Sequence, residues 1–200
     1  MAQPPKRTAR GRPRTITLER IADVGIAMGL PNVTFVGLAA ELGVSHMALY
    51  KHVPSLKDLK ALIAEEIFKR WEMPVILGRK REELKDYLIK FTDSLRNLVK
   101  SNPGLPPYLL RRSVATPSMT DKIGQHQKFL AEIYGISDSR AQWLLSTIAF
   151  HCIAVADTLY SDIDEVSDLE SITDEAEVEA EFSHGMHALI VGALSLSEKE

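Results

Sequence analysis

Six neighbouring side chains able to hydrogen-bond or make apolar contacts follow a glycine in the N-terminal third of the chain. Histidine and lysine can hydrogen-bond to acceptors on base edges, and methyl-bearing side chains can contact the thymine methyl group. A tyrosine hydroxyl can bind a phosphate. The run therefore has the chemistry needed to contact DNA from an exposed helix. Its members are His46, Met47, Ala48, Tyr50, Lys51 and His52.

The residues around this run predict two short helices joined by a three-residue turn. Thr34 can cap the first helix, because its side-chain oxygen can accept a backbone N–H of the first turn. Gly43 comes where that helix must stop, and glycine adopts the left-handed conformation there without a Cβ penalty. Ser45 can cap the second helix. This is the pattern of a helix-turn-helix, whose second helix can enter a DNA major groove. Its expected core residues are Leu38, Leu42, Val44 and Leu49.

Residues 1–15 predict a basic arm rather than a helix, because three prolines interrupt them. The segment RGRPR carries Arg10, Arg12 and Arg14. Such a compact, extended basic segment can lie in a narrow minor groove, where the potential is most negative. Composition alone favours a disordered, solubilising tail. The nearby helix-turn-helix favours contact with DNA.

Charge is unevenly spread along the chain. Residues 1–60 hold nine Lys/Arg and four Asp/Glu, although the whole chain has a formal net charge of −3. A basic end with an acidic remainder indicates that only the N-terminal end meets a polyanion. Residues 157–183 hold eleven Asp/Glu and no Lys or Arg, and part of this stretch, Ser161 to Thr173, predicts a mobile acidic loop.

The expected compartment is the cytosol. The N-terminus has no apolar segment of the kind found in secretory signals. No uninterrupted apolar run reaches the length of a membrane span, so no membrane partner is predicted. The single cysteine, Cys152, cannot form an intramolecular disulfide, so nothing argues for an oxidising compartment.

The chain shows helical periodicity throughout and no strand-like alternation, which predicts an all-α fold. We divide it into the arm 1–15, a helix-turn-helix domain with a connector helix over 16–72, and a C-terminal helical bundle for effector binding and dimerisation over 79–197. The helix from Ser137 to Tyr160 is expected to be largely buried, because it is apolar on more than one side. The other expected helices are Thr17–Met28, one from Ser55 to before Pro74, one from about Arg79 to Asn102, Pro106–Val114, Met119–Tyr134 and about Asp174–Leu196.

The last predicted helix indicates a dimer interface. Gly185 and Gly192 are seven residues apart and lie near one face. A glycine inside a helix costs about 1 kcal/mol relative to alanine, and close approach of another helix would offset that cost. We therefore expect a homodimer built on a helix bundle. The predicted interface residues are Phe182, Gly185, Met186, Leu189, Gly192 and Ala193.

Three segments together resemble the TetR family of bacterial transcription repressors. They are GRPR before the first helix, LAAELGVS across the turn and ALYKHVPS leading into a fourth helix. The resemblance is strongest over residues 12–71, and FSHGMHALIVGAL resembles the family's final dimer helix. It implies an all-helical homodimer that binds a palindromic DNA operator and is released by a small apolar or amphipathic effector. It implies no cofactor, and movement of the fourth helix on effector binding.

Carried over by position, the resemblance assigns DNA-contacting residues. Thr34 would approach a phosphate, Tyr50 and His52 would contact the DNA backbone, and the other members of the run would face the groove. Two positions depart from the family's pattern: Leu56 stands where a lysine is common, with Lys57 next, and Gly37 lacks a side chain where a polar contact is common. The full DNA-binding set is Arg10, Arg12, Arg14, Thr34, Ser45, His46, Met47, Ala48, Tyr50, Lys51, His52 and Lys57.

The resemblance also places six residues on helices that line the effector pocket in that family. They are Phe91, Tyr108, His126, Trp143, Thr147 and His151. Thr147 and His151 lie four apart and so share a helix face. Ordinary core packing remains the alternative for all six, since aromatic residues at helical spacing are usually core.

Other classes of function have less support in the sequence. A Gly-rich phosphate loop, HExxH, GxSxG and a catalytic carboxylate pair are all lacking, so no enzyme is expected. An enzyme with a helical catalytic domain remains one alternative, and an architectural DNA-binding protein without an effector is another. His184, His187 and Cys152 do not have the spacing of a metal site, and no metal is predicted.

Overall fold

The computed structural model describes residues 16–76, 81–160 and 175–196, and every regular element in these ranges is helical. The all-α prediction is confirmed. Two expected segments, the arm with Arg10, Arg12 and Arg14 and the acidic stretch 161–173, lie outside the described residues. The helices are α1 (Leu18–Met28), α2 (Phe35–Leu42), α3 (His46–Leu49), α4 (Leu56–Arg70), α5 (Arg81–Ser101), α6 (Pro106–Leu110), α7 (Pro117–Tyr134), α8 (Asp138–Tyr160) and α9 (Glu175–Ser195).

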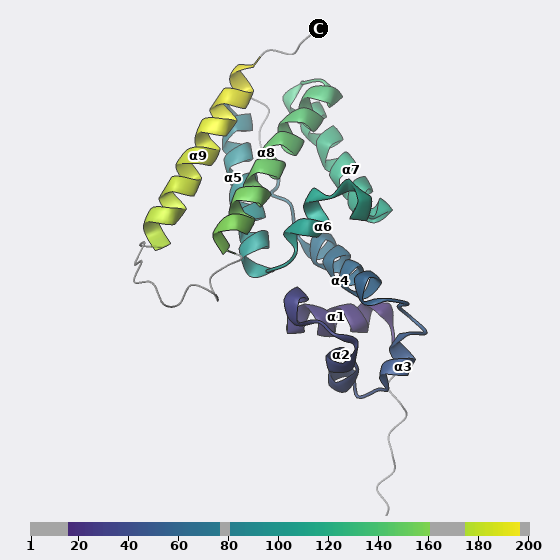
Figure 1. Cartoon of the computed structure of the whole chain (residues 1–200). Helices are drawn as coiled ribbons and strands as arrows, with labels where there is room; N and C mark the ends of the chain where they lie inside the picture. The colour runs from purple at the N-terminus through teal and green to yellow at the C-terminus, as the bar shows by residue number, and fades with distance from the viewer. Residues whose placement is uncertain (1–15, 77–80, 161–174, 197–200) are drawn as a thin grey trace, which may run out of the picture.

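Helix α4 connects two parts of the molecule (Figure 1). It packs on α1 of the small unit and also on α7 of the larger bundle, and both contacts involve its C-terminal half. Ser55 and Asp58 form a capping pair at its start: the amide of Asp58 donates to Oγ of Ser55 at 3.1 Å, and the Ser55 hydroxyl donates to the Asp58 carboxylate. It ends at Arg70, before Pro74 as expected.

The buried apolar residues of the small unit α1–α3 belong to a core that continues through α4 into the bundle. Thr17 caps α1 by accepting the amide of Arg20 at 3.2 Å. Close approach of α1 and α4 requires a glycine at position 25, since a Cβ there would lie 2.3 Å from Cδ1 of Ile63. Gly29 ends α1 with φ 75° and ψ 136°, a positive φ outside the left-handed helical region.

Helices α5, α8 and α9 pack side by side, and α7 covers another side of α8 (Figure 1). Five apolar residues spaced four, three, four and three apart form one buried stripe of α5. They are Leu84, Leu88, Phe91, Leu95 and Leu98. The helix predicted over Pro106–Val114 is instead two pieces, α6 and a 3-10 turn at Arg112–Val114, because Arg111 is extended at φ −95° and ψ 109°.

Among the described helices, α8 is long and apolar enough to span a membrane by length and composition alone, with a mean hydropathy of 1.3 over its most apolar window. We did not anticipate this, because we counted only uninterrupted apolar runs. In this fold α8 packs against α5, α6, α7 and α9, and one face of it forms the centre of the bundle. That buried face carries Ala141, Leu144, Leu145, Ile148, Cys152, Ile153 and Ala156.

The opposite face of α8 is open in the single chain. Trp143 and Phe150, seven residues apart on this face, are 39% and 54% exposed, and Val155, on another side near the end of α8, is 43% exposed. The expectation that α8 is buried on more than one side is therefore wrong for the isolated chain. Apolar side chains that share an uncovered helix face leave a surface on which another helix can pack.

Helix α9 is fixed to the bundle by one acidic side chain. The carboxylate of Glu179 accepts from Arg96, from Lys100 at 3.1 Å and from the Tyr160 hydroxyl at 2.7 Å. Burial favours the neutral form of Glu179, but the hydrogen bonds from Tyr160 and Lys100 and the two cations outweigh it and lower its pKa. The guanidinium of Arg96 also lies 5.4 Å from the centre of the Phe182 ring.

The predicted dimer residues of α9 divide between two faces. Phe182, Met186 and Ala193 are buried within the chain, so these three pack on its own helices rather than facing outward. The periodicity could not separate the two faces, because both carry small or apolar residues. Gly185 and Gly192 are exposed, with open space where a side chain would be. Leu189 is partly buried between the two faces.

Candidate nucleic-acid interface and effector region

The turn between α2 and α3 forms as the sequence predicts. Thr34 accepts the amide of Gly37 at 3.0 Å and so caps α2. Gly43 is left-handed at φ 69° and ψ 36°, and its amide and that of Val44 donate to the last turn of α2. The chain thereby reverses within three residues and starts α3 at His46.

Helix α3 is shorter than predicted. It ends at Leu49, and residues 50–52 continue as turns. The amides of His52 and Val53 both donate to the Leu49 carbonyl at 2.9 Å, so the turn stays tied to the helix. Ser45 occupies the N-cap position with extended backbone, but its side chain makes no capping hydrogen bond. His46, Met47 and Ala48 therefore lie on a single turn of α-helix, and the other three residues of the run lie in the turn that follows it. Packing holds this helix in place more than its own caps do.

The division of this motif into core and outward residues is confirmed for nearly every position. Leu38, Leu42 and Leu49 are buried, and Val44 is partly buried. Met47 is 62% exposed. Ala48 is half-buried. The other outward residues are all exposed: Thr34, Ser45, His46, Tyr50, Lys51, His52 and Lys57.

Tyr50 has a packing role as well as an exposed edge. Its ring stacks on Phe35 of α2 with centroids 4.3 Å apart and an angle of 12° between the planes. It is still 45% exposed. The stack fixes the ring at the end of α3, so its hydroxyl is positioned on the same unit as Lys51 and His52.

The two departures from the family pattern have local explanations. A Cβ at Gly37 would lie 3.0 Å from Cε of Met28 and 3.0 Å from Oγ1 of Thr34, so a side chain there would crowd the cap of α2. Leu56 is 41% exposed at the first position of α4, and the neighbouring Lys57 is exposed too. A basic group is thus still present at the start of α4, one residue later.

Two of the six predicted effector residues meet in the bundle. His126 of α7 hydrogen-bonds to the hydroxyl of Tyr87 on α5, and its ring lies 6.3 Å from that of Phe91. Burial and the nearby Lys122 lower the pKa of His126, while burial and the neighbouring Tyr134 raise the pKa of Tyr87. Both groups are therefore neutral at pH 7, and the imidazole tautomer decides which of the two donates the hydrogen bond.

The sequence did not predict Tyr87 as an effector residue, because it lies one turn from Phe91 among apolar residues whose spacing predicts core packing. Its ring centroid is 5.9 Å from that of His126 and 6.4 Å from that of Tyr134. These aromatic rings surround one polar pair. We name Tyr87, Phe91, His126 and Tyr134 the aromatic cluster. Tyr108, on α6, is partly buried, and burial raises its pKa.

The three predicted effector residues on α8 lie apart from the aromatic cluster. Trp143 is exposed, and the guanidinium of Arg140 lies 4.8 Å from its ring centre. His151 is exposed, and its Nδ1 lies 2.7 Å from the backbone carbonyl oxygen of Thr147. Thr147 is partly buried. The predicted shared face of Thr147 and His151 exists, but His151 points to the surface of the chain rather than into the bundle.

Cys152 is buried, and its Sγ lies 3.5 Å from the Thr92 carbonyl oxygen. Burial raises the pKa of this thiol to about 12, so it is a neutral core group. Within the described parts of the chain, no group of three or more His, Cys, Asp or Glu side chains is placed to hold a metal ion.

Comparison with known proteins supports the resemblance in sequence and in fold. No family model matches the sequence. A curated protein, the HTH-type transcriptional repressor DrrR1 of Streptomyces coeruleorubidus, is 34% identical over 77 residues, which cover 36% of this chain and 28% of that repressor. The chain thus matches less than a third of this relative's length.

Solved structures match nearly the whole chain. TetR from Acinetobacter baumannii in complex with minocycline has a TM-score of 0.68 at 19% identity, covering 91% of this chain and 96% of that one. The TetR family protein ActR of Streptomyces coelicolor in complex with (S)-DNPA has 0.68 at 18%, covering 90% and 98%. BioQ with its double-stranded DNA operator has 0.63 at 16%, covering 91% and 100%.

The chain is therefore built as a helix-turn-helix unit joined by a long helix to a helical bundle. This is the fold of the TetR family of regulators, and the resemblance stated from the sequence is confirmed at the level of fold.

Proposed function

We propose that the protein is a ligand-responsive, sequence-specific DNA-binding regulator of transcription, acting as a homodimeric repressor that a small molecule releases from a palindromic operator. The observation that carries the proposal is the exposed run on and after α3. His46, Met47 and Lys51 project from a unit whose other face is a closed apolar core. Exposed side chains with this mixture of donors and methyl groups are suited to the major groove.

The N-terminal residues support the same proposal. Thr34 and Lys57 are exposed at the starts of α2 and α4, where backbone N–H groups and positive charge favour a phosphate. The basic arm precedes α1 and would add charge and minor-groove contacts. The similar repressor DrrR1 and the similar complex of BioQ with operator DNA agree with this role.

Dimerisation is supported by the open faces of the last two helices. Phe150 and Val155 of α8 and Val191 of α9 are each more than 40% exposed. Gly185 and Gly192 leave space beside them. We infer that a second copy of the chain covers this surface, with its α8 and α9 against these two. Such an isologous interface gives the two-fold symmetry that a palindromic operator requires.

We infer that the effector contacts the aromatic cluster. An apolar wall with one neutral polar pair, Tyr87 and His126, suits a small apolar or amphipathic molecule. Structures similar to this chain hold minocycline and (S)-DNPA. The proposed domains are residues 16–72 for DNA and 79–197 for effector and dimer, and the proposed compartment is the bacterial cytoplasm. Among the similar proteins named above, DrrR1 is described as a transcriptional repressor.

A thermal-shift screen followed by a release assay tests this proposal. A compound that binds only the native state raises the melting temperature. The expected result is a hit that also dissociates the protein from duplexes enriched by selection from random DNA. A hit that is chemically converted during incubation would instead support an enzyme. Stabilising hits without release would support an architectural DNA-binding protein.

A further inference from the structure

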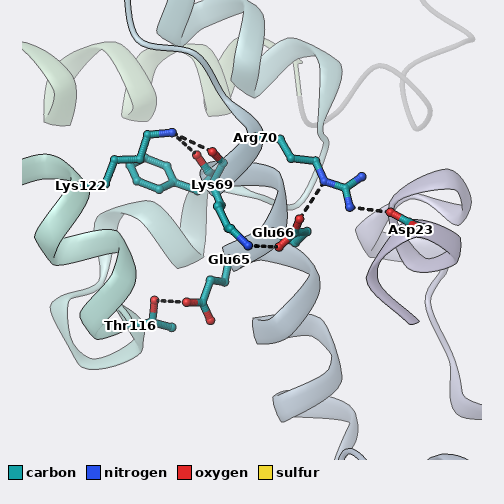
Figure 2. Close-up of polar contacts among 8 residues, drawn as sticks. Asp23, Glu65, Glu66, Lys69, Arg70, Thr116 and Lys122 are labelled. Carbon is teal, nitrogen blue, oxygen red and sulfur yellow. Dashed lines mark hydrogen bonds and ion pairs between the residues drawn. The ribbon is translucent and has the colours of Figure 1, made fainter. Parts of the chain in front are cut away.

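The C-terminal end of α4 is capped by a side chain from another helix. Carbonyl groups in the last turn of a helix have no partner within it. The amino group of Lys122, on α7, donates to the carbonyls of Phe68 at 3.0 Å and Lys69 at 2.9 Å (Figure 2). It also donates to the carbonyl of Trp71. One ammonium group with three N–H donors thus serves three carbonyls.

The electrostatics of this contact favour a cation. The C-terminal end of a helix carries partial negative charge, which a positive group stabilises. The ammonium also lies 5.4 Å from the centre of the Phe68 ring, which adds a cation–π contact. Burial lowers the pKa of Lys122, and the charge of Glu72 opposes that effect. The lysine is therefore bound in place rather than left extended in solvent.

A second contact joins the same two helices. The hydroxyl of Thr116, at the N-cap of α7, donates to Glu65 of α4 at 2.9 Å, while its oxygen accepts the amide of Met119 at 3.3 Å (Figure 2). We name these two contacts, Lys122 with its three carbonyls and Thr116 with Glu65, the α7–α4 clamp. Because the contacts lie at separate points of α4, they fix its direction as well as its position.

Helix α4 carries this constraint to α1. Arg70, in the last turn of α4, donates to Asp23 of α1 and, at 2.9 Å, to Glu66 one turn earlier (Figure 2). Exposed ion pairs of this kind contribute little stability. They do set an orientation, and beside them Ile63 fills the space at Gly25. A rotation of α4 would therefore move α1 and the motif packed on it.

The clamp is also tied to the aromatic cluster. His126 follows Lys122 by one helical turn on the same face of α7. Trp71, whose carbonyl Lys122 binds, donates its indole N–H to Ser94 of α5 at 2.9 Å and lies 6.1 Å from Phe91, centroid to centroid. A molecule that displaces His126 or Phe91 would act on both sides of the Lys122 contact.

We propose that Lys122 is the positioning residue that holds α4 in the DNA-binding orientation, and that an effector acts by breaking its contact with the end of α4. This proposal rests on the proposed function, because it takes the aromatic cluster as the effector region. The clamp has two states, made or broken, which is what a switch requires.

Hydrogen exchange on the full chain without DNA tests the clamp directly. The variants are Lys122→Met, which removes the charge at similar length, Lys122→Arg, which keeps donors and charge, and Lys128→Met, an exposed lysine on the same helix, as control. Lys122→Met is expected to raise exchange at least fivefold in α1 and the last turns of α4 while leaving α8 unchanged. Lys122→Arg should restore most of the protection, and Lys128→Met should behave as wild type.

Operator affinity provides the second readout, on duplexes enriched by the wild-type protein. Lys122→Met is expected to weaken binding by about fivefold or more, in the range of typical coupling effects, and Lys122→Arg to stay within about twofold. Unchanged exchange in α1, or an equal effect in Lys128→Met, would overturn the proposal. If the wild-type chain enriches no DNA, the proposed function fails while the exchange experiment still decides the clamp.

A further pair of variants covers the case in which Lys122→Met does not fold. Glu65→Ala removes the acceptor for the Thr116 hydroxyl, whereas Glu65→Gln keeps an oxygen there. Faster exchange in α1 for Glu65→Ala and not for Glu65→Gln supports the clamp. Wild-type exchange in both contradicts it.

Discussion

Ile63 on α4 occupies the space where any side chain at position 25 of α1 would have to lie. A Cβ at Gly25 would be 2.3 Å from Cδ1 and 2.6 Å from Cγ1 of Ile63. Atoms cannot approach so closely, so Ile63 or one of the two helices would have to move to admit a side chain at position 25. The crossing sets the angle between the helix-turn-helix unit and α4.

Gly25→Ala is therefore expected to lower the free energy of unfolding by about 1–3 kcal/mol, the usual cost of overpacking. Urea denaturation measures it. Gly124→Ala is the matched control, because nothing lies within 4 Å of a Cβ at that helical glycine, and it should stabilise by about 0.5–1 kcal/mol. In an Ile63→Ala background the cost of Gly25→Ala should largely disappear. A stabilising Gly25→Ala would show that the crossing is not tight.

The outward glycines of α9 test the dimer in a similar way. In the single chain, nothing lies within 4 Å of a Cβ at Gly192, just as at Gly124. Gly192→Ala is therefore expected to raise the helix propensity of α9 but to weaken the dimer at least tenfold, because its methyl group would meet the partner helix. Sedimentation velocity over a range of concentrations measures this. If the variant dimerises as well as Gly124→Ala does, another surface forms the interface.

His126 predicts a pH dependence of stability. Its pKa is lowered in the folded chain, so the unfolded state binds a proton first as the pH falls. Above about pH 6.5, the pKa of a histidine in the unfolded chain, His126 therefore has no effect on stability. Below that pH it lowers the free energy of unfolding progressively. His126→Gln, which does not titrate, should lose less stability between pH 7 and pH 5 than the wild type does. An identical pH profile in the two proteins would contradict a buried, neutral His126.

The basic arm should appear in the salt dependence of DNA binding. Each phosphate neutralised adds about −0.9 to the slope of log K against log[salt]. Removal of residues 1–14 takes away five Lys/Arg, so the slope should become shallower by about two to four. Fluorescence anisotropy at several salt concentrations measures it. A slope that does not change would assign the arm no role in binding.

Most helices could be predicted from the sequence, because the residues that start and end them are local signals. Thr17, Thr34, Ser55 and Ser137 occupy the predicted capping positions, and Gly43 and Gly135 are left-handed at the ends of their helices. The exposure of the run on and after α3 could be predicted, because its residues are interspersed with buried ones within one short motif. These patterns need only residues that are close in the chain.

The contacts between helices could not be predicted from the sequence. Nothing in the periodicity of α9 distinguishes the face packed on α5 and α8 from the face left open, so Phe182, Met186 and Ala193 were assigned outward. His151 shares its face with Thr147 as predicted, but the rotation of α8 in the bundle turns it to the surface. Tyr87 and Lys122 have no motif, and their roles arise from residues 39 and 51 positions away, respectively.

The central claim is that α3 reads a DNA sequence in a dimer. The most direct test is to select bound fragments from random DNA with the wild type, with His46→Ala and with Lys51→Ala. The wild type should enrich a two-fold symmetric motif. His46→Ala or Lys51→Ala should lose preference at the same position in both half-sites, with about 1–3 kcal/mol less discrimination there. Enrichment without symmetry, or unchanged preference and affinity in both variants, would contradict sequence reading by α3 in a dimer.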